Sequence, residues 1–416
     1  MSRIDDLIRR HCPNGVEYRA LAEVTTRSSH IKWAEAGIAE RRYIDLSSVD
    51  RVTRRITEPM PISAGNAPSR AQQIVREGDV IFATTRPTQM RWAVIPRELD
   101  AQIASTGFCV LRPDQGRVLT NFLAHLLGAE RFRRYVEREQ VPGNYPSIPD
   151  RLVRQFRIPV PPIEVQREIV RVLDLFQSLE AELEAELEAR RRQYAHYRDS
   201  LLAFTEFERE REIRWLTLGE LGSLFGGLTG KSKADFQSGN ARYVSYMNVY
   251  ANISTDVLPE ETVKIGDGER QRRLSRGDIL FTGSSETPEE CGMSSVITVD
   301  PPEPLYLNSF CIGFRPHLAD VLDPEFAKHL FRSLTMRQQI VRTANGVTRF
   351  NVSKKRLAKV LVPVPTLAEQ IRIAAILDNF EALVNDLAVG LPAELVARRK
   401  QYEHYRDRLL TFEEAA

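Results

Sequence analysis

A seven-residue period of apolar positions runs from Ile163 to Phe204. One heptad position carries Ile169, Phe176, Leu183, Arg190, Tyr197 and Phe204, and a second carries Leu173, Glu180, Leu187, Tyr194 and Leu201. Nine of these eleven residues are apolar or aromatic. The pattern predicts one long amphipathic helix with a continuous apolar seam. At 1.5 Å per residue, this helix is roughly 60 Å long.

The same pattern returns near the C-terminus. PVPPIEVQREIVRVLDLF, from Pro159, matches PVPTLAEQIRIAAILDNF, from Pro363, at an offset of 204 residues. RRRQYAHYRDSLL, from Arg190, matches RRKQYEHYRDRLL, from Arg398, at an offset of 208. The second seam contains Ile373, Leu377, Phe380, Val384 and Leu387, and then, four residues out of phase, Leu395, Tyr402, Tyr405 and Leu409. Gly390 and Pro392 lie at the phase break and predict a kink or an interruption.

The segments that precede the two helices are also related. REGDVIFATT, residues 76–85, corresponds to SRGDILFTGS, residues 275–284, and in both copies Gly-Asp predicts a turn into a buried strand. The amphipathic stretches 121–138 and 324–341 predict helices. The expected fold class is therefore α+β, a tandem duplication of a module followed by a long helix. The expected domains are modules at 1–158 and 211–362 and helical regions at 159–210 and 363–416.

Two long apolar seams need a partner surface, and the simplest partner of each helix is the other. Because each helix leaves one of two related modules, antiparallel pairing as a coiled coil gives the chain a pseudo-two-fold axis. The alternative is that each helix packs back on its own module. Two matched seams are difficult to bury separately, so we favour pairing.

Composition excludes several classes of protein. Hydrophobic residues make up 42% and charged residues 27% of the 416 residues, which is typical of globular chains with more than one domain. No apolar run is long enough to span a membrane, and the first residues do not resemble an export signal. Cys12, Cys109, Cys291 and Cys311 form no CxxC pair, which predicts free thiols in a reducing cytoplasm.

Charge divides the chain into alternating segments. Residues 1–158 contain 25 Lys and Arg against 18 Asp and Glu, a net +7, and residues 211–362 contain 20 against 17, a net +3. The helical regions are acidic, with 7 basic residues against 12 acidic ones in 159–210 and 6 against 9 in 363–416. Basic modules favour a polyanionic partner.

The sequence contains no complete catalytic motif among those considered below. FGGLTGKSKADF, residues 225–236, resembles a phosphate-binding loop, but Phe225 occupies the position of the first glycine. VDPPEP, residues 299–304, resembles an amino-methyltransferase motif, but Glu303 replaces its aromatic residue. The sequence contains neither HExxH nor Gly-x-Ser-x-Gly. We therefore interpret these segments as a glycine-rich loop and a proline-rich loop, and we predict no metal site.

Over essentially its whole length, the chain resembles the specificity (S) subunits of Type I restriction-modification systems. The most specific matches are the two Pro-Val-Pro segments leading into EVQREIVRVLD and AEQIRIAAILD, and the two basic, tyrosine-containing helices. The resemblance implies a non-catalytic, cytoplasmic subunit of a bacterium or archaeon. Its two target-recognition domains each read half of a split DNA site. Two methyltransferase (M) subunits with S-adenosylmethionine, and restriction (R) motor-nuclease subunits with ATP and Mg, are the implied partners.

The resemblance implies that the basic loops contact DNA, through base edges or phosphates. The candidates are Thr84, Thr85, Arg86, Gln89, Arg91, Asn144 and Tyr145 in the first module, and Lys231, Lys233, Arg272, Arg273, Ser284, Ser285, Thr348, Arg349 and Asn351 in the second. The candidates for helix pairing or partner docking are Leu173, Phe176, Leu183, Leu187, Tyr194, Tyr197, Leu377, Phe380, Leu387, Leu395, Tyr402 and Tyr405.

Two other interpretations remain open from the residues. The chain could be a coiled-coil adaptor with two interaction modules, which sequence-dependent and salt-sensitive DNA binding by the assembled complex would exclude. Alternatively, it could be a complete methyltransferase, for which methyl transfer by the purified chain alone is the test.

Overall fold

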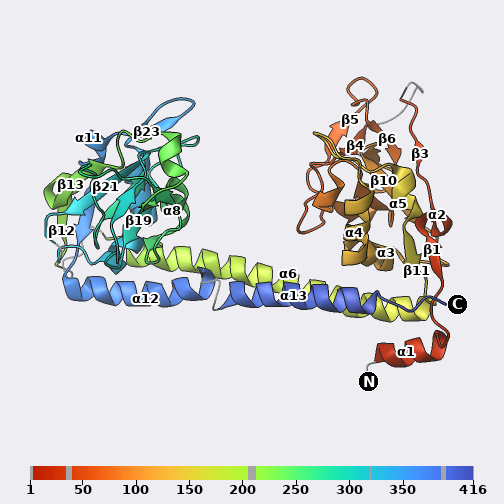
Figure 1. Ribbon diagram of the computed structural model, residues 1–416. Helices are drawn as coiled ribbons and strands as arrows, with labels where there is room; N and C mark the ends of the chain where they lie inside the picture. Colours follow the sequence, from red (N-terminus) through yellow and green to blue (C-terminus); the bar gives the residue numbers. More distant parts are fainter. Residues whose placement is uncertain (1–2, 34–39, 205–211, 319, 386–389, 416) are drawn as a thin grey trace. The chain divides into compact units, whose positions relative to one another are not determined.

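A computed structural model describes residues 3–33, 40–204, 212–318, 320–385 and 390–415 (Figure 1). The chain forms two compact units. Unit 1 contains Met1–Glu184 together with Glu394–Ala416, and unit 2 contains Ala185–Ala393. Each unit is thus a module with parts of two helical segments.

Unit 1 contains small antiparallel and mixed sheets with short helices around them. Its elements are α1 (Arg3–His11), β1 (Tyr18–Ala20), α2 (Leu21–Val24), β2 (Thr25–Thr26), β3 (Ser29–His30), β4 (Arg41–Ile44), β5 (Met60–Ile62), β6 (Ala71–Ile74), β7 (Val80–Ala83), η1 (Pro87–Gln89), β8 (Trp92–Val94), η2 (Arg97–Leu99), β9 (Ile103–Ser105), β10 (Phe108–Pro113), α3 (Thr120–Gly128), α4 (Glu130–Glu139), α5 (Asp150–Gln155) and β11 (Arg157–Pro159). The first part of α6 (Ile163–Leu201) and most of α13 (Leu391–Leu409) complete it.

Unit 2 has the same kind of module. Its elements are β12 (Arg214–Thr217), α7 (Leu218–Leu221), β13 (Gly222–Gly226), η3 (Lys233–Phe236), β14 (Ala241–Val244), α8 (Tyr246–Ala251), β15 (Ser254–Thr255), β16 (Thr262–Val263), β17 (Ile279–Thr282), β18 (Ser284–Ser285), β19 (Ser294–Ile297), β20 (Leu305–Leu307), β21 (Cys311–Pro316), α9 (Pro324–Leu330), α10 (Leu334–Val341), β22 (Ala344–Asn345), β23 (Phe350–Val352), α11 (Lys354–Leu357) and β24 (Leu361–Val364). The last part of α6 and α12 (Leu367–Asn385) complete it.

Strand pairing confirms the predicted duplication. In unit 1 the order β2-β10-β7-β8 corresponds to β13-β21-β17-β19 of unit 2. A parallel pair, β4 with β9, likewise corresponds to β14 with β20, and β1 with β11 corresponds to β12 with β24. The two modules therefore share one topology, with local additions such as β6 in unit 1 and β15 in unit 2.

The repeated Gly-Asp sequence has a structural explanation. Gly78 and Gly277 adopt φ values of +80° and +86°, which glycine reaches without strain, and β7 and β17 follow directly. The carboxylate of Asp79 accepts two hydrogen bonds from the guanidinium of Arg112, each 2.8 Å long. Asp278 accepts the equivalent pair from Arg315 at 2.7 and 2.6 Å. Both carboxylates are 1% exposed, so each turn is fixed to the adjacent strand by a bidentate ion pair whose carboxylate is buried.

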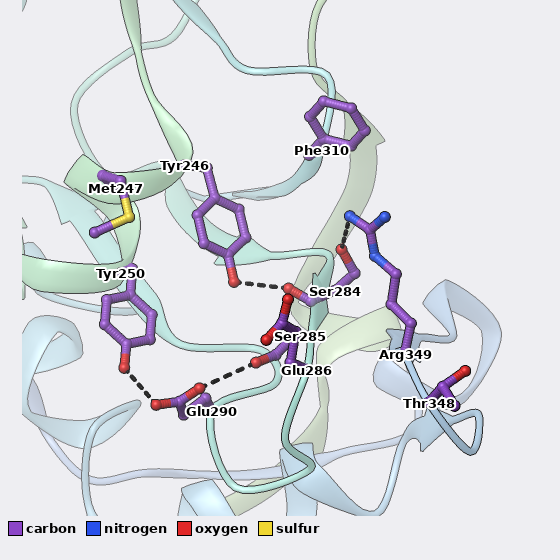
Figure 2. A pocket seen from close by; sticks show the side chains of 10 residues that line it. All are labelled: Tyr246, Met247, Tyr250, Ser284, Ser285, Glu286, Glu290, Phe310, Thr348 and Arg349. Atoms are coloured by element: carbon purple, nitrogen blue, oxygen red, sulfur yellow. Dashed lines mark hydrogen bonds between the residues drawn. The ribbon is translucent and has the colours of Figure 1, made fainter. Parts of the chain in front are cut away.

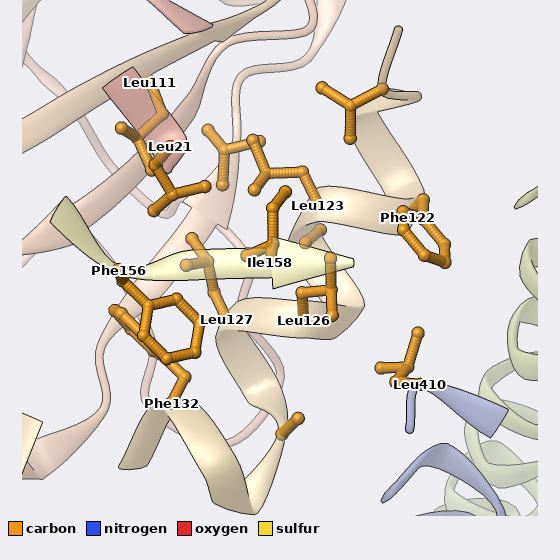
Figure 3. Packing of buried hydrophobic residues seen from close by; sticks show 14 of the residues in the cluster. Leu21, Leu111, Phe122, Leu123, Leu126, Leu127, Phe132, Phe156, Ile158 and Leu410 are labelled. Carbon is orange, nitrogen blue, oxygen red and sulfur yellow. The ribbon is translucent and has the colours of Figure 1, made fainter. Parts of the chain in front are cut away.

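Apolar side chains on the sheets and helices form a separate core in each unit. In unit 1, Phe122 and Leu126 of α3 and Ile158 of β11 lie in one cluster with Leu410, which comes from the far end of the sequence (Figure 3). In unit 2, Phe326 and Leu330 of α9 join a cluster that includes Leu377. Each module is thus packed directly onto its helical segments.

All four cysteines are buried and free, as predicted. Burial raises the pKa of the Cys109 and Cys311 thiols to about 12, so both stay protonated at neutral pH. Among the residues that the structure describes, no helix has the length and apolar character needed to cross a bilayer.

Each helix predicted inside the modules is divided in two. The stretch 121–138 forms α3 and α4 with Ala129 between them, and 324–341 forms α9 and α10. Asp407 of α13 accepts a hydrogen bond from the first backbone N–H of α4 at 3.1 Å, and Asp199 of α6 does the same for α10 at 2.9 Å. A carboxylate at a helix N-terminus satisfies an otherwise unpaired N–H group. Both stretches are helical, as predicted, and their division into two helices could not be predicted because the capping carboxylate lies on a distant segment.

The long seams meet within each unit. In unit 1, α6 and α13 run antiparallel, because Phe176 stacks on Tyr405 at 5.4 Å whereas Glu180 accepts a 2.6 Å hydrogen bond from Arg399. In unit 2, Tyr197 of α6 stacks on Phe380 of α12 at 5.3 Å. The predicted helix pairing is therefore confirmed inside each unit. The helices also pack on the modules, which was the alternative to pairing: Leu173 and Leu377 are fully buried in the cores of the modules.

The phase break between the two parts of the second seam is an interruption, as predicted. Helix α12 ends at Asn385 and α13 begins at Leu391, and Gly390 has a φ of +82°. Leu387 lies outside the described residues. Helix α6 has no such break and runs for 39 residues, ending three residues before the predicted Phe204.

Equivalent polar contacts join module and helices in each unit. His125 lies 2.8 Å from Asp174 of α6 through Nε2 and 3.0 Å from the Tyr402 hydroxyl through Nδ1. In unit 2, His329 makes the same contacts with Asp378 at 2.7 Å and with Tyr194 at 3.0 Å. We call each His-Asp-Tyr set a polar junction. In each junction the Tyr and the Asp come from different helical segments, so one histidine fixes both helices to the module.

Each unit also contains a buried glutamine that bonds to loop backbone. Gln166 accepts from the backbone of Leu119 at 2.9 Å and donates to the carbonyls of Arg117 and Pro161. Gln370 makes the corresponding bonds in unit 2, including one from the backbone of Asp323 at 2.8 Å. The two glutamine side chains are 0% and 1% exposed, and they supply hydrogen-bond partners to loop N–H and carbonyl groups that water does not reach.

Tyr402→Phe should lower the free energy of unfolding by about 1 kcal/mol, because the buried Nδ1 atom of His125 then loses its partner. Tyr194→Phe should have a similar effect through His329. Denaturant unfolding of the full chain measures both. Tyr197→Phe is the matched control, since this ring is 41% exposed and its stacking on Phe380 needs no hydroxyl. An equal loss in the control would contradict the importance of the junction hydroxyls.

Candidate nucleic-acid interface

In both modules the strand after Gly-Asp leads into an edge that carries predicted contact residues. In unit 1 the backbone after β7 approaches the segment 141–148. Thr85 forms a bridge with Ser147, and the Arg86 N–H donates to the Pro146 carbonyl at 2.6 Å. In unit 2, β18 pairs with β23, whose other neighbour is β22. The backbone bonds Ile148 to Thr84 and Val352 to Gly283, both 2.9 Å, occupy the same place in the two copies.

Arg86 and Tyr145 together form the exposed part of this edge in unit 1. The guanidinium carbon of Arg86 lies 5.0 Å from the centre of the Tyr145 ring, a cation-π distance. Arg86 has a φ of +50°, in the left-handed region that costs free energy for a residue with a side chain. Tyr145 is 70% exposed, and Asn144 beside it is exposed as well. A cation and a flat ring are thereby held together at the surface.

The corresponding tip of unit 2 is a tight hairpin. Gly346 has a φ of +140°, and a Cβ atom there would lie 1.9 Å from the Arg349 carbonyl, so the turn requires glycine. Arg349 donates to the Ser284 hydroxyl at 3.3 Å. Thr348, Arg349 and Asn351 are all exposed, and the tip therefore presents polar side chains to solvent.

A pocket of about 790 Å³ lies beside this tip (Figure 2). It is lined by Tyr246, Met247, Tyr250, Ser284, Ser285, Glu286, Glu290, Phe310, Thr348 and Arg349. Four of these residues, Ser284, Ser285, Thr348 and Arg349, are candidates from the sequence. Helix α8, the β17–β18 segment and the hairpin tip all contribute to the pocket, so residues far apart in sequence converge here.

Some predicted contact residues are buried or engaged in the fold. Thr84 is 8% exposed, and its hydroxyl donates to the Gly107 carbonyl at 2.9 Å. Ser284 and Ser285 are buried at the base of the pocket. Arg91 is partly buried and bonds to the Leu46 carbonyl, and burial lowers its pKa. These side chains shape the edge, and direct DNA contact by them stays a prediction.

Two further predicted residues, Gln89 and Lys231, differ in their surroundings. Gln89 is exposed at the end of η1, next to Arg86. Lys231 donates 2.6 Å hydrogen bonds to Glu269 and to the Lys264 carbonyl, and its bond lowers the pKa of Glu269 to about 2. This pairing neutralises Lys231 locally.

The remaining basic candidates of unit 2 are exposed. Lys233 begins η3, and the guanidinium of Arg272 lies 4.7 Å from the centre of the Phe225 ring. Arg273 is exposed, and its carbonyl accepts a bond from Arg315. Their positive charge is available to a polyanion.

Sequence reasoning missed most of the pocket wall. Tyr246, Tyr250, Glu286, Glu290, Met247 and Phe310 were not among the predicted contacts. Two signals were present: Tyr246 and Tyr250 have the four-residue spacing of neighbours on a helix, and the segment ETPEE, with three glutamates, follows Ser285 directly. Exposed Phe310 has no such signal, and Met247, next to Tyr246 in α8, has no polar group that indicates a contact.

Comparison with known proteins identifies these modules. A family model described as Type I restriction modification DNA specificity domain matches residues 52–189 and again 212–397. The Type I restriction enzyme EcoR124I/EcoR124II specificity subunit of Escherichia coli is 34% identical over 273 residues, which cover 62% of this chain. The match spans 64% of the length of that relative.

A solved structure supports the fold over nearly the whole chain. It is described as the structural basis underlying complex assembly and conformational transition of the type I R-M system. One chain of it has a TM-score of 0.66 at 23% identity and is matched over 98% of its length, with 96% of this chain covered. Together with the two matches to the family model, which cover more than half of the residues, the duplicated topology leads to one conclusion: the chain belongs to the Type I restriction modification DNA specificity domain family.

Proposed function

We propose that this chain is the DNA-recognition subunit of a Type I restriction-modification complex and that each module reads one half of a bipartite DNA site. The observation that carries the proposal is the repeated edge after β7 and β17. Each of the two copies of one family domain carries an exposed arginine and exposed amide or hydroxyl side chains at this edge, which is the chemistry that reads base edges.

The helical segments suit a second role in the same complex. Two methyltransferase subunits would dock on the paired helices, whose acidic composition disfavours direct contact with DNA. Restriction subunits would join this assembly. S-adenosylmethionine, ATP and Mg would be bound by those partners, and this chain would direct both methylation and cleavage without a catalytic site of its own.

Arg86→Ala should relax recognition in one half-site and leave the other unchanged. Loss of one arginine contact to guanine costs about 1–3 kcal/mol, or about 5- to 150-fold in affinity for the cognate site. The assay is methylation and binding by the complex with methyltransferase subunits, on a library of DNA sites varied in each half. Binding by the intact complex should also weaken steeply with salt.

Arg97→Ala is the matched control. It removes the same charge from an exposed residue of the same module, but η2 lies at the opposite end of the β7–β8 pair from Arg86. Equal loss of base discrimination in both half-sites, or an equal loss in the Arg97→Ala control, would contradict the proposal that each module reads one half-site. Sequence-independent binding by the intact complex would instead favour an adaptor role.

A further inference from the structure

The pocket of unit 2 contains an unusual combination for a surface that faces DNA: a cation and a free carboxylate beside apolar side chains. Met247 and Phe310 are 61% and 62% exposed at its rim. Arg349 and Glu286 are exposed on the same pocket (Figure 2). Under the proposed function, on which the base-pair assignment rests, this pocket faces DNA.

Local contacts position two tyrosines and a glutamate of the pocket. The rings of Tyr246 and Tyr250 are stacked, with centres 6.3 Å apart. Tyr246 donates to the Ser284 carbonyl at 2.7 Å, and Tyr250 donates to Glu290 at 2.8 Å. Glu290 also accepts from Thr287 at 3.0 Å, and these bonds lower its pKa. Glu290 is therefore a positioning residue, whose carboxylate is already used within the protein.

Glu286 differs from Glu290. Among the hydrogen bonds and ion pairs identified between described residues, none involves its side chain. An ionised carboxylate on a DNA-facing surface is repelled by phosphate, and the groups on DNA that can satisfy it are exocyclic amino groups such as N4 of cytosine. Glu286 therefore lowers affinity for DNA in general and favours a base pair that places an amino group within its reach.

Arg349 complements this carboxylate. One of its nitrogens donates to the Ser284 hydroxyl at 3.3 Å, which leaves further N–H groups of the guanidinium to donate. Arginine donates in bidentate fashion to N7 and O6 of guanine, and this is the commonest specific contact in the major groove. A guanine paired with cytosine presents both the acceptors that Arg349 needs and the donor that Glu286 needs.

We propose that the half-site read by unit 2 contains a G·C base pair selected jointly by Arg349, which donates to guanine, and Glu286, which accepts from the cytosine amino group. Unit 1 lacks this pair of side chains. In the aligned repeats Pro87 occupies the place of Glu286 and Tyr145 that of Arg349. Joint selection by an arginine and a glutamate is therefore confined to the half-site of unit 2.

The test uses the full chain in complex with its methyltransferase subunits and a DNA library in which every position of both half-sites is varied. Arg349→Ala should reduce affinity for the cognate site about 5- to 150-fold and abolish discrimination at one G·C pair of one half-site. Arg349→Lys should keep the charge but lose most of this discrimination, because an ammonium cannot donate in bidentate fashion.

Glu286→Ala should lose discrimination at the same base pair while binding random DNA more tightly than the unmodified complex. Glu289→Ala is the matched control: it removes the same charge from an exposed neighbour that does not line the pocket. It should increase binding to random DNA without any change in base preference.

Three results would overturn the proposal: discrimination that is unchanged in both Arg349 variants, a base pair other than G·C at the affected position, or identical behaviour of Glu286→Ala and Glu289→Ala. If Arg86→Ala still relaxes the other half-site in such a case, the proposed function stands and the G·C assignment alone fails. If the intact complex shows no sequence-dependent binding, both fail.

Discussion

Asp79→Ala is expected to lower the free energy of unfolding by about 3 kcal/mol. The carboxylate is 1% exposed and accepts two hydrogen bonds from Arg112 and a third, of 2.8 Å, from the backbone N–H of Arg76. Its removal leaves the guanidinium of Arg112, 22% exposed, without its ion-pair partner. Trp92 is buried in the same unit, so its fluorescence during denaturation in urea reports the loss.

Asp278→Ala should destabilise unit 2 in the same way but by about 2 kcal/mol, because the Arg315 side chain is more exposed, at 37%, and water replaces part of the lost contact. Asp6→Ala is the control. The Asp6–Arg9 pair is more than half exposed on both sides, and such pairs contribute about 0–1 kcal/mol. A change below 1 kcal/mol in the Asp79 variant would show that the repeated Gly-Asp turn is fixed by backbone conformation alone.

Deletion of Glu180–Leu183 is expected to shorten the gap between the two half-sites by one or two base pairs without changing either half-site. Four residues of α6 contribute about 6 Å of rise and about 40° of rotation beyond one turn. DNA rises about 3.4 Å per base pair with about ten base pairs per turn. Deleting one unit therefore corresponds to about one base pair by rotation and nearly two by rise. Sequencing of methylated sites after expression of the shortened chain measures the gap.

The repeat allows this deletion to preserve the helix pair of unit 1. Arg399 of α13 bonds to both Glu180 and Glu184, which are four residues apart. After the deletion, Glu184 and Glu188 take these two places, and the leucine spacing is kept. The control is Glu180→Ala with Glu184→Ala in the full-length helix, which removes the ion pairs but leaves the length and should leave the gap unchanged. An unaltered gap in the deletion variant would reject the spacer role.

Features that repeat in the sequence were predictable. The offsets of 204 and 208 residues predicted the duplicated modules, the Gly-Asp strands and the interrupted second seam, because each rests on local conformation or on a periodic pattern. The polar junctions were not predictable. His125 and Tyr402 are 277 residues apart, and a single histidine or tyrosine in a helix carries no sign of its partner. The break between α3 and α4 depends on Asp407 in the same way.

The segments that form the candidate interface were predictable, but the contacts between their side chains were not. The polar composition of 84–91 and 346–351 predicted exposed contact segments, and Arg86, Asn144, Thr348 and Arg349 are indeed exposed. The stacking of Arg86 on Tyr145 could not be inferred, because it depends on how two loops approach each other. Glu286 was missed because an acidic side chain in a polar loop is ordinarily interpreted as a solvated one.

The buried glutamines and polar junctions have a consequence for how such a protein acquires new specificity. Gln166 and Gln370 receive the same backbone bonds from their modules, and His125 and His329 meet the same Asp and Tyr pair. A module that keeps these few attachment points finds matching partners in either position of the chain. Under the proposed function, a chain whose module is exchanged for another that keeps these contacts should read a new combination of half-sites without adjustment of the helices.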